Sequence, residues 1–179
     1  MLGCVIGGIT VTGLNPDSQQ GDKVILDILK RCGGKFKPIE GGLHFDRSLL
    51  KATEIDLADC PDLGPICSRS AAFCSGETVI RNAGRLRLKE SDRIEAMQTE
   101  LRKMGARIEV DGDTVHIQGV ALHAPNAPLS GHNDHRIVMA LAVAAIASGL
   151  PALLCGPRPW TRAGPRSGAC CAVLAPRWN

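Results

Sequence analysis

The stretch Arg-Leu-Lys-Glu-Ser-Asp-Arg-Ile-Glu-Ala-Met-Gln-Thr-Glu-Leu-Arg-Lys-Met-Gly, residues 87–105, decides the fold of this chain. Its second half carries apolar side chains at the spacing of one helix face, namely Ile94, Met97, Leu101 and Met104. Ser91 is a suitable N-cap, Asp92 suits the positive end of a helix dipole, and Gly105 suits the C-terminal stop. The sequence therefore predicts an amphipathic helix between Ser91 and Gly105.

A dense cluster of charges precedes this helix. Lys89, Glu90, Asp92 and Arg93 fall within five consecutive positions. Free backbone N–H groups and cationic side chains meet at such a helix start, which suits it to hold an anion. The alternative is a solvated, well-capped surface helix, and charge alone favours that alternative.

Composition excludes several classes of protein. The chain has 179 residues, enough for a substantial core, and a net charge of only +3, which argues against a nucleic-acid or membrane-surface partner. Three Phe and no Tyr argue against a base-stacking platform. The longest apolar run, residues 137–147, is too short to span a bilayer, and nothing at the start resembles a signal peptide.

The eight cysteines form no Cys-x-x-Cys motif. They predict buried, reduced thiols and a cytoplasmic location, and neither a disulfide framework nor a zinc site.

Two successive sets of similar elements follow a short strand at residues 9–13. The first set is a helix at 22–32, a hairpin at 35–45, a strand at 53–57, a helix from 61 to about 74 and a strand at 78–81. The second is the central helix, a hairpin at 107–117, a strand at 120–123, a helix at 137–147 and a strand at 152–155. We therefore expect an α+β (α/β) fold built from a duplicated unit of about seventy residues. The helix at 137–147 is apolar on every side, which predicts burial on every face.

Equivalent helix starts in this repeat carry reactive side chains. Asp62 begins one helix, and His132-Asn-Asp-His-Arg136 begins the matching one. An arginine beside a buried helix needs a carboxylate or phosphate partner, and an internal pair with Asp134 is as good an explanation as a ligand. Asp62 alone is most often a plain N-cap. His132 and His135 lack a third ligand at suitable spacing, so we expect no metal site.

Three motifs resemble those of one known family. Residues 87–94 with the downstream Glu-Leu-Arg-Lys-Met-Gly closely resemble a signature of the EPSP synthase (3-phosphoshikimate 1-carboxyvinyltransferase) family. Asn-Asp-His-Arg-Ile-Val-Met-Ala at 133–140 and Cys-Pro-Asp-Leu-Gly-Pro at 60–65 match two further motifs, in the same order and at the expected distances. The resemblance covers roughly residues 7–156.

The resemblance implies an activity and a set of residue roles. The family transfers the enolpyruvyl group of phosphoenolpyruvate to shikimate 3-phosphate, in aromatic amino-acid biosynthesis, without metal or organic cofactor. It implies that Asp62 is the general base and that Glu90 moves the proton of the enolpyruvyl methylene carbon. The implied ligands of the two substrates are Arg93, Arg136 and His135 for phosphoenolpyruvate, and Lys89 with Asp62 for shikimate 3-phosphate.

The resemblance also implies the architecture. The family has two lobes, each with three β-α-β-α-β-β units whose helices are buried. Residues 1–156 correspond to about two of the three units of the C-terminal lobe, and the other lobe, which completes the site, is absent from this sequence. We therefore expect the chain alone to be inactive.

The tail, residues 157–179, departs from the family pattern. One set of codons for residues 159–165, read in another frame, encodes Val-Asp-Lys-Ser-Trp-Pro, the segment that the family carries here. We therefore interpret residues 157–179 as a frameshifted, disordered extension.

Two alternatives stay open. One is a relative of UDP-N-acetylglucosamine enolpyruvyl transferase, which shares the fold. The other is a truncated, non-catalytic product that at most binds anions.

Overall fold

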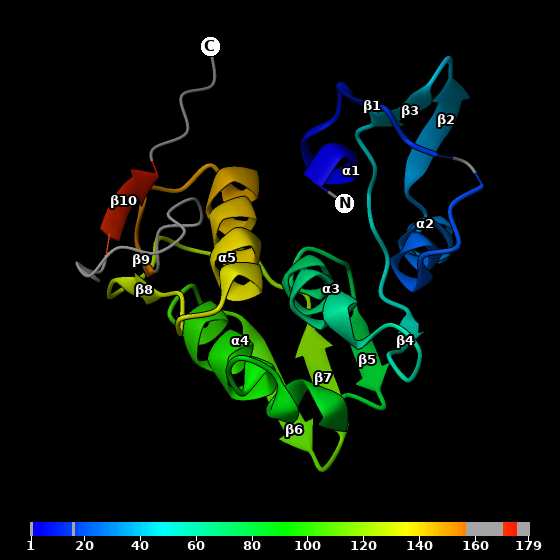
Figure 1. Cartoon of the computed structure of the whole chain (residues 1–179). Coiled ribbons are helices and arrows are strands. Elements are labelled where there is room, and N and C mark those ends of the chain that lie inside the picture. Colours follow the sequence, from blue (N-terminus) through cyan, green and yellow to red (C-terminus); the bar gives the residue numbers. More distant parts are fainter. Residues whose placement is uncertain (1, 16, 157–169, 175–179) are drawn as a thin grey trace, which may run out of the picture.

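The computed structural model describes residues 2–15, 17–156 and 170–174. Helices α3, α4 and α5 pack against one another, and three sheets surround them (Figure 1). The predicted mixture of helices and strands is confirmed. Within the described residues, no helix combines the length and the apolarity needed to cross a membrane.

The N-terminal part holds the first sheet and two helices. Helix α1 spans Leu2–Ile6, and α2 spans Ile25–Arg31 after a short 3-10 turn, η1, at Gly21–Val24. The strands pair antiparallel in the order β1-β3-β2, with bounds Ile9–Thr12, Gly42–Asp46 and Lys35–Ile39. The predicted hairpin and helix are confirmed, while α1 was not anticipated by the sequence pattern.

The central part holds a sheet of order β4-β5-β7-β6 and the helical segments in and around which Asp62, Lys89, Glu90 and Arg93 lie. Its strands are β4 Glu54–Asp56, β5 Glu77–Arg81, β6 Arg107–Asp111 and β7 Thr114–Gln118. Its helical segments are η2 Pro61–Leu63, α3 Gly64–Ala71, η3 Gly84–Leu88 and α4 Arg93–Arg102. All four apolar side chains of the predicted α4 stripe are buried.

The C-terminal part consists of a third sheet and α5. Strands β8 Leu129–Ser130, β9 Ala152–Gly156 and β10 Cys170–Leu174 pair in the order β10-β9-β8, and α5 spans His135–Ser148. The strand predicted at residues 120–123 is wrong, because this segment is irregular and β8 supplies the parallel partner of β9. Lys103 and Met104 at the end of α4 bind the backbone of this segment and of the loop after it, which holds it away from a sheet.

The predicted repeat is visible in the strand pairing. Strands β4 and β5 pair parallel across α3, as β8 and β9 do across α5. Each helix-to-strand step passes through a glycine with positive φ, Gly76 after α3 and Gly149 after α5. Gly7 has the same conformation between α1 and β1, and β1 pairs with β3 as β5 pairs with β7. The α1–β1 step is therefore a third copy of this junction.

Helix α5 departs from the expectation of burial on every face. Its inner face, Ile137, Ala140, Leu141, Ala144 and Ala145, is buried, but Met139 on the opposite face is 49% exposed. Helices α1, α3 and α4 and strands β9 and β10 all contact α5, yet the described residues leave the stripe through Met139 only partly covered.

The structure differs in part from the predictions of a disordered tail and of reduced cysteines. Residues 157–169 and 175–179 lie outside the described residues, but residues 170–174 form β10 where disorder was expected. The apolar run Cys-Cys-Ala-Val-Leu suits a strand on the edge of β9. Cys155 is disulfide-bonded, contrary to the expectation for reduced thiols, whereas the five cysteines 4, 32, 60, 67 and 74 are free and buried.

Candidate anion-binding site at three helix starts

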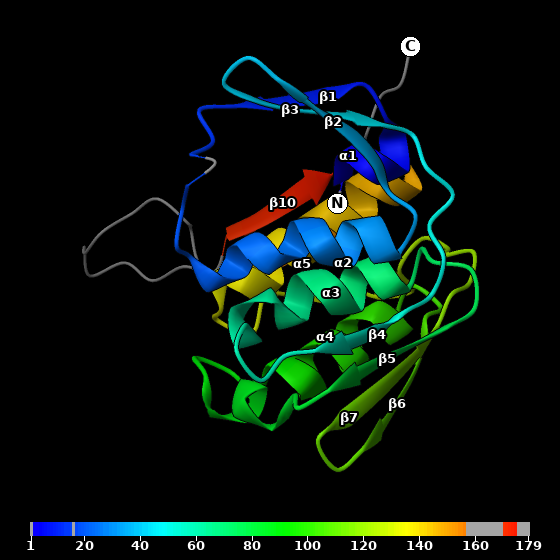
Figure 2. The same ribbon diagram turned by 90° about the vertical axis from the view of Figure 1, so that its right-hand side faces the viewer.

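The starts of α3, α4 and α5 bring the charged side chains together. Figure 2 shows α3 above α4, with α5 behind α2 in this view, and contacts between all three pairs of α3, α4 and α5 hold them together. Asp62 lies in η2, directly before α3, and Lys89 and Glu90 lie between η3 and α4. Arg93 is the first residue of α4, and Arg136 is the second residue of α5.

Arg93 is the centre of the network. It is only 1% exposed, and its guanidinium contacts three carboxylates. Nε donates to Asp134 Oδ2 at 2.7 Å, Nη1 to Asp62 Oδ1 at 3.0 Å, and Nη2 to Glu90 Oε2 at 2.5 Å. A buried guanidinium requires such partners, because an uncompensated charge in the interior is costly.

Asp62 is shared by three cations. Besides Arg93, it contacts Lys89 Nζ at 3.2 Å through Oδ1, and its Oδ2 accepts from Arg136 Nη2 at 3.0 Å. Arg136 Nη1 also donates to the Asp62 backbone carbonyl at 3.2 Å. Partial burial raises the pKa of the Asp62 carboxyl, but the hydrogen bond from Lys89 and the charge of Arg136 outweigh it, so the pKa lies below its usual value.

Asp134 is a site residue that the sequence analysis considered only as a partner of Arg136. It is fully buried, caps α5 by accepting from the Arg136 backbone N–H at 2.8 Å, and binds Arg93 and the Ser91 hydroxyl. Burial raises the pKa of its carboxyl, and the hydrogen bonds from Arg93 and the Arg136 amide lower it to below the usual value. The signal for its role was its place directly before an apolar helix, which identifies a cap and not its distant partner.

The helix α4 begins one residue later than predicted. Asp92, not Ser91, is the N-cap, and its Oδ1 accepts from the backbone N–H groups of Ile94 and Glu95, both at 3.0 Å. Ser91 instead donates to Asp134 at 3.2 Å. A carboxylate at the cap has the further advantage that its negative charge lies at the positive end of the helix dipole.

The predicted residues divide into two groups. Asp62, Lys89, Glu90, Arg93 and Arg136 lie within one network of ion pairs. His135 is exposed at the start of α5 and takes no part in the hydrogen bonds of this network. His132 binds Glu100 instead, so the two histidines do not converge.

The network balances three cations against three carboxylates. Lys89 and Arg136 keep about a quarter of their side-chain surface exposed, at 28% and 26%, so both can reach a ligand. An anion arriving at these cations would compete with Asp62 for them. The described residues contain no group of three or more potential metal ligands.

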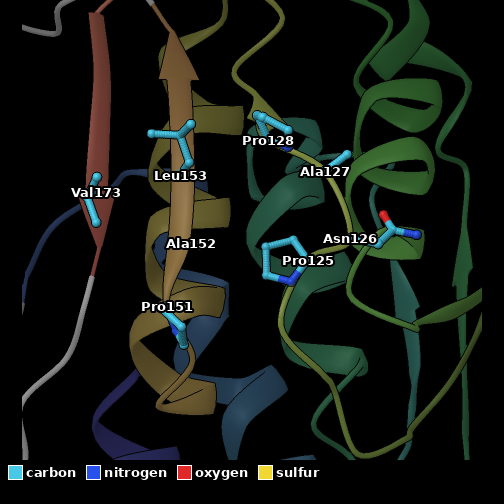
Figure 3. Close-up of a pocket in the computed structure, with 8 residues that line it drawn as sticks. All are labelled: Pro125, Asn126, Ala127, Pro128, Pro151, Ala152, Leu153 and Val173. Atoms are coloured by element: carbon cyan, nitrogen blue, oxygen red, sulfur yellow. The ribbon is translucent and has the colours of Figure 1, made fainter.

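A separate hollow lies away from these charges. It measures about 370 Å³ and is lined by Pro125, Asn126, Ala127, Pro128, Pro151, Ala152, Leu153 and Val173. Figure 3 shows that these residues come from the loop at 125–128, from Pro151 and β9 after it, and from β10, and none of them is charged.

Comparison with known proteins gives the family. The family model of EPSP synthase (3-phosphoshikimate 1-carboxyvinyltransferase) matches residues 1–153. The chain belongs to the EPSP synthase family. A 3-phosphoshikimate 1-carboxyvinyltransferase of Clostridium botulinum (strain Eklund 17B / Type B) is 42% identical over 147 residues, which make up 82% of this chain and 34% of that protein. The one of Clostridium acetobutylicum is 46% identical over 144 residues, or 80% of this chain and 33% of that protein.

Solved structures agree with an enolpyruvyl transferase fold. An EPSP synthase from Acinetobacter baumannii superposes with a TM-score of 0.62 at 26% identity, covering 83% of this chain and 38% of that one. The enolpyruvyl transferase NikO from Streptomyces tendae superposes with a TM-score of 0.55 at 21% identity, which supports the fold alone. The chain spans about a third of the length of the EPSP synthase family members that it matches.

Proposed function

We propose that this chain forms one side of an active site that transfers the enolpyruvyl group of phosphoenolpyruvate to shikimate 3-phosphate, releasing phosphate. The observation that carries this proposal is the convergence of Lys89, Arg93 and Arg136 on Asp62 at three helix starts. Both substrates are small and strongly anionic, so a site for them requires cations in fixed positions. The coverage supports a shared site, because the stretch that matches makes up only about a third of each EPSP synthase family member compared.

The three cations would have different roles, because they differ in exposure. Arg136 and Lys89 are accessible and would contact phosphoenolpyruvate and shikimate 3-phosphate respectively, with His135 beside Arg136. Arg93 is buried and fully occupied by carboxylates, so in this conformation it holds Asp62 and Glu90 in place. It would bind phosphoenolpyruvate directly once the ligand displaces one of these carboxylates.

Asp62 and Glu90 would move the protons. The sugar hydroxyl attacks C2 of phosphoenolpyruvate, its proton passes to Asp62, and Glu90 delivers a proton to the methylene carbon. A tetrahedral intermediate forms, and loss of phosphate with return of that methyl proton to Glu90 gives the product. The lowered pKa makes Asp62 a weak base in the ligand-free site. Anions that draw Lys89 and Arg136 away would raise its basicity when both substrates are present.

Reconstitution tests this proposal. The chain is mixed with the remaining two thirds of a relative, including the family's Lys-Ser-Trp-Pro type of segment, and phosphate release is followed with both substrates. We expect turnover in the mixture and none from the chain alone, because positioning by both lobes supplies most of the rate. A chelator should not change the rate, since the family requires no metal.

Variants identify the responsible residue. Asp62→Asn in the mixture should lower the rate about 10²- to 10⁴-fold, as expected for loss of a general base. The control is Asp59→Asn, at an exposed position three residues before Asp62, which should leave the rate unchanged. Binding of a UDP-sugar in place of shikimate 3-phosphate would favour the sister family. A mixture that binds both substrates without releasing phosphate would support the non-catalytic alternative.

A further inference from the structure

A second buried carboxylate, Glu100, lies on the same helix as Arg93. Glu100 is seven residues after Arg93, two turns along α4, and is only 1% exposed. Burial of a glutamate requires compensating donors. Its carboxylate accepts from three donors, namely Lys103, the Ser130 backbone N–H and His132. None of these donors belongs to the network around Asp62.

The donors tie Glu100 to the segment that leads into α5. Its Oε2 accepts from the Ser130 backbone N–H at 2.8 Å, and its Oε1 contacts His132 Nε2 at 2.9 Å. Lys103 Nζ contacts both carboxylate oxygens, at 2.9 and 2.8 Å, and also donates to the Pro128 carbonyl at 3.0 Å. Glu100 and Lys103 therefore fix residues 128–132 to the side of α4.

This segment has an unfavourable backbone. His132 and Asn133 have φ values of 49° and 55°, a region that non-glycine residues rarely adopt. Such residues persist where the surroundings impose them. The next residue is Asp134, which caps α5 and binds Arg93, and two residues further Arg136 contacts Asp62.

We propose that Glu100 is a positioning residue: its carboxylate holds residues 130–133 in the conformation that presents Asp134 to Arg93 and Arg136 to Asp62. Helix α4 then holds this segment at two points, through Glu100 on one turn and through Arg93 two turns earlier. The inference rests on the proposed function only for the identity of the anion that Arg136 binds.

Hydrogen exchange on the full chain without ligand tests the first half of this inference. In Glu100→Ala the amide protons of residues 130, 132, 134 and 136 should exchange at least about tenfold faster. The Ser130 amide loses its acceptor, and the other three are hydrogen-bonded within residues 130–136, which Glu100 holds in place. The control is Glu95→Ala, which removes an exposed glutamate from the same helix and should leave these amides unchanged. Unchanged exchange in Glu100→Ala would overturn the inference.

Anion binding tests the second half. Titration of the full chain with phosphoenolpyruvate should give about tenfold weaker binding for Glu100→Ala, and no further loss when this change is added to Arg136→Ala. Equal, additive losses in both backgrounds would show a general structural effect and overturn the positioning role.

The conservative variant supplies a rescue. Glu100→Gln keeps a side-chain oxygen that can accept from the Ser130 amide. We expect affinity within about threefold of the unmodified chain. If the unmodified chain itself fails to bind phosphoenolpyruvate, the proposed function loses support, while the exchange experiment still decides the role of Glu100.

Discussion

At the scale of single residues, Arg93 and Asp134 form an ion pair with almost no access to solvent. Removing Asp134 takes away the partner of Arg93 Nε and the N-cap of α5, and leaves Arg93 with Asp62 and Glu90. Breaking a buried pair of this kind costs about 3–5 kcal/mol. Asp134→Ala should therefore lower the free energy of unfolding by about that amount in urea titrations. The control is Glu54→Ala, which breaks the exposed pair with Arg81 and should cost less than about 1 kcal/mol. Similar losses in the two variants would contradict the burial of the pair.

The carboxylates of Asp62 and Asp134 predict that the fold loses stability in acid. The pKa values of Asp62 and Asp134 are lowered in the folded chain, so the unfolded chain binds protons more readily than the folded one. Their contribution to stability is complete above the unfolded value of about 3.9 and is lost as pH falls through the lower folded values. Asp134→Asn should lose less stability than the unmodified chain between about pH 5 and about pH 2. Urea titrations across this range measure it, and parallel losses would disprove the contribution of Asp134.

Arg69 is a buried arginine that, unlike Arg93, lacks carboxylate partners among the described residues. It is 3% exposed in α3, and its Nε and Nη1 have no hydrogen-bond partner among the described residues. Burial lowers its pKa to about 10, with the nearby thiols of Cys67 and Cys74 acting weakly in the other direction. The folded state disfavours the protonated form, so the cost is complete below about pH 10 and diminishes as pH rises above that value.

Replacing this guanidinium with an apolar side chain should stabilise the fold. Arg69→Met keeps most of the volume and removes the unpaired donors, and we expect a gain of about 1–4 kcal/mol in the free energy of unfolding. Arg107→Met, at an exposed strand position, should change it by less than about 0.5 kcal/mol. A loss of stability in Arg69→Met would mean that the guanidinium has a partner.

At the scale of elements, the cap of α4 can be measured directly. Asp92 accepts two backbone hydrogen bonds at the helix start, so Asp92→Ala should cost about 0.5–2 kcal/mol. Glu95→Ala, in the first turn but outside the cap, should cost no more than a few tenths of a kcal/mol. Thermal unfolding of the two variants distinguishes them, and equal midpoints would contradict the capping role of Asp92.

Local patterns predicted the elements that depend on local interactions. The α4 stripe and both hairpins follow from periodicity and turn residues, and the structure confirms them. Helix α1 has only five residues, too few for a periodic signal, and β8 has two, which pair because β9 lies beside them. These elements are set by tertiary contacts, which no local pattern encodes.

At the scale of the whole molecule, the candidate site also depends on tertiary contacts that local sequence patterns do not reveal. Motif resemblance identified five residues that the fold brings together from three separate helix starts. It did not identify Asp134 as the partner of Arg93, because the two are 41 positions apart in the chain. Arg93 was expected as a ligand residue, and the structure adds that its guanidinium is occupied by carboxylates of this chain.

The partly covered face of α5 predicts how the chain behaves in solution. Met139 is half exposed, and Val138, Ala142, Val143 and Ile146 beside it are only partly covered. A contiguous apolar stripe of this kind favours association between molecules. We expect sedimentation velocity to show concentration-dependent association. We also expect low and broad thermal unfolding, because an apolar stripe left in water adds nothing to a stability that is small in any domain.

A single charge on this stripe should show whether association and low stability have separate causes. Met139→Glu places a carboxylate at the centre of the apolar face and should shift the chain toward monomer without lowering its free energy of unfolding, because the position is already half solvated. Leu49→Glu, at an isolated position that is 94% exposed, should leave association unchanged. If Met139→Glu unfolds the chain instead, this face of α5 is packed in solution. A sharp monomeric transition in the unmodified chain would also contradict the prediction, because it would show that the α5 stripe needs no further cover.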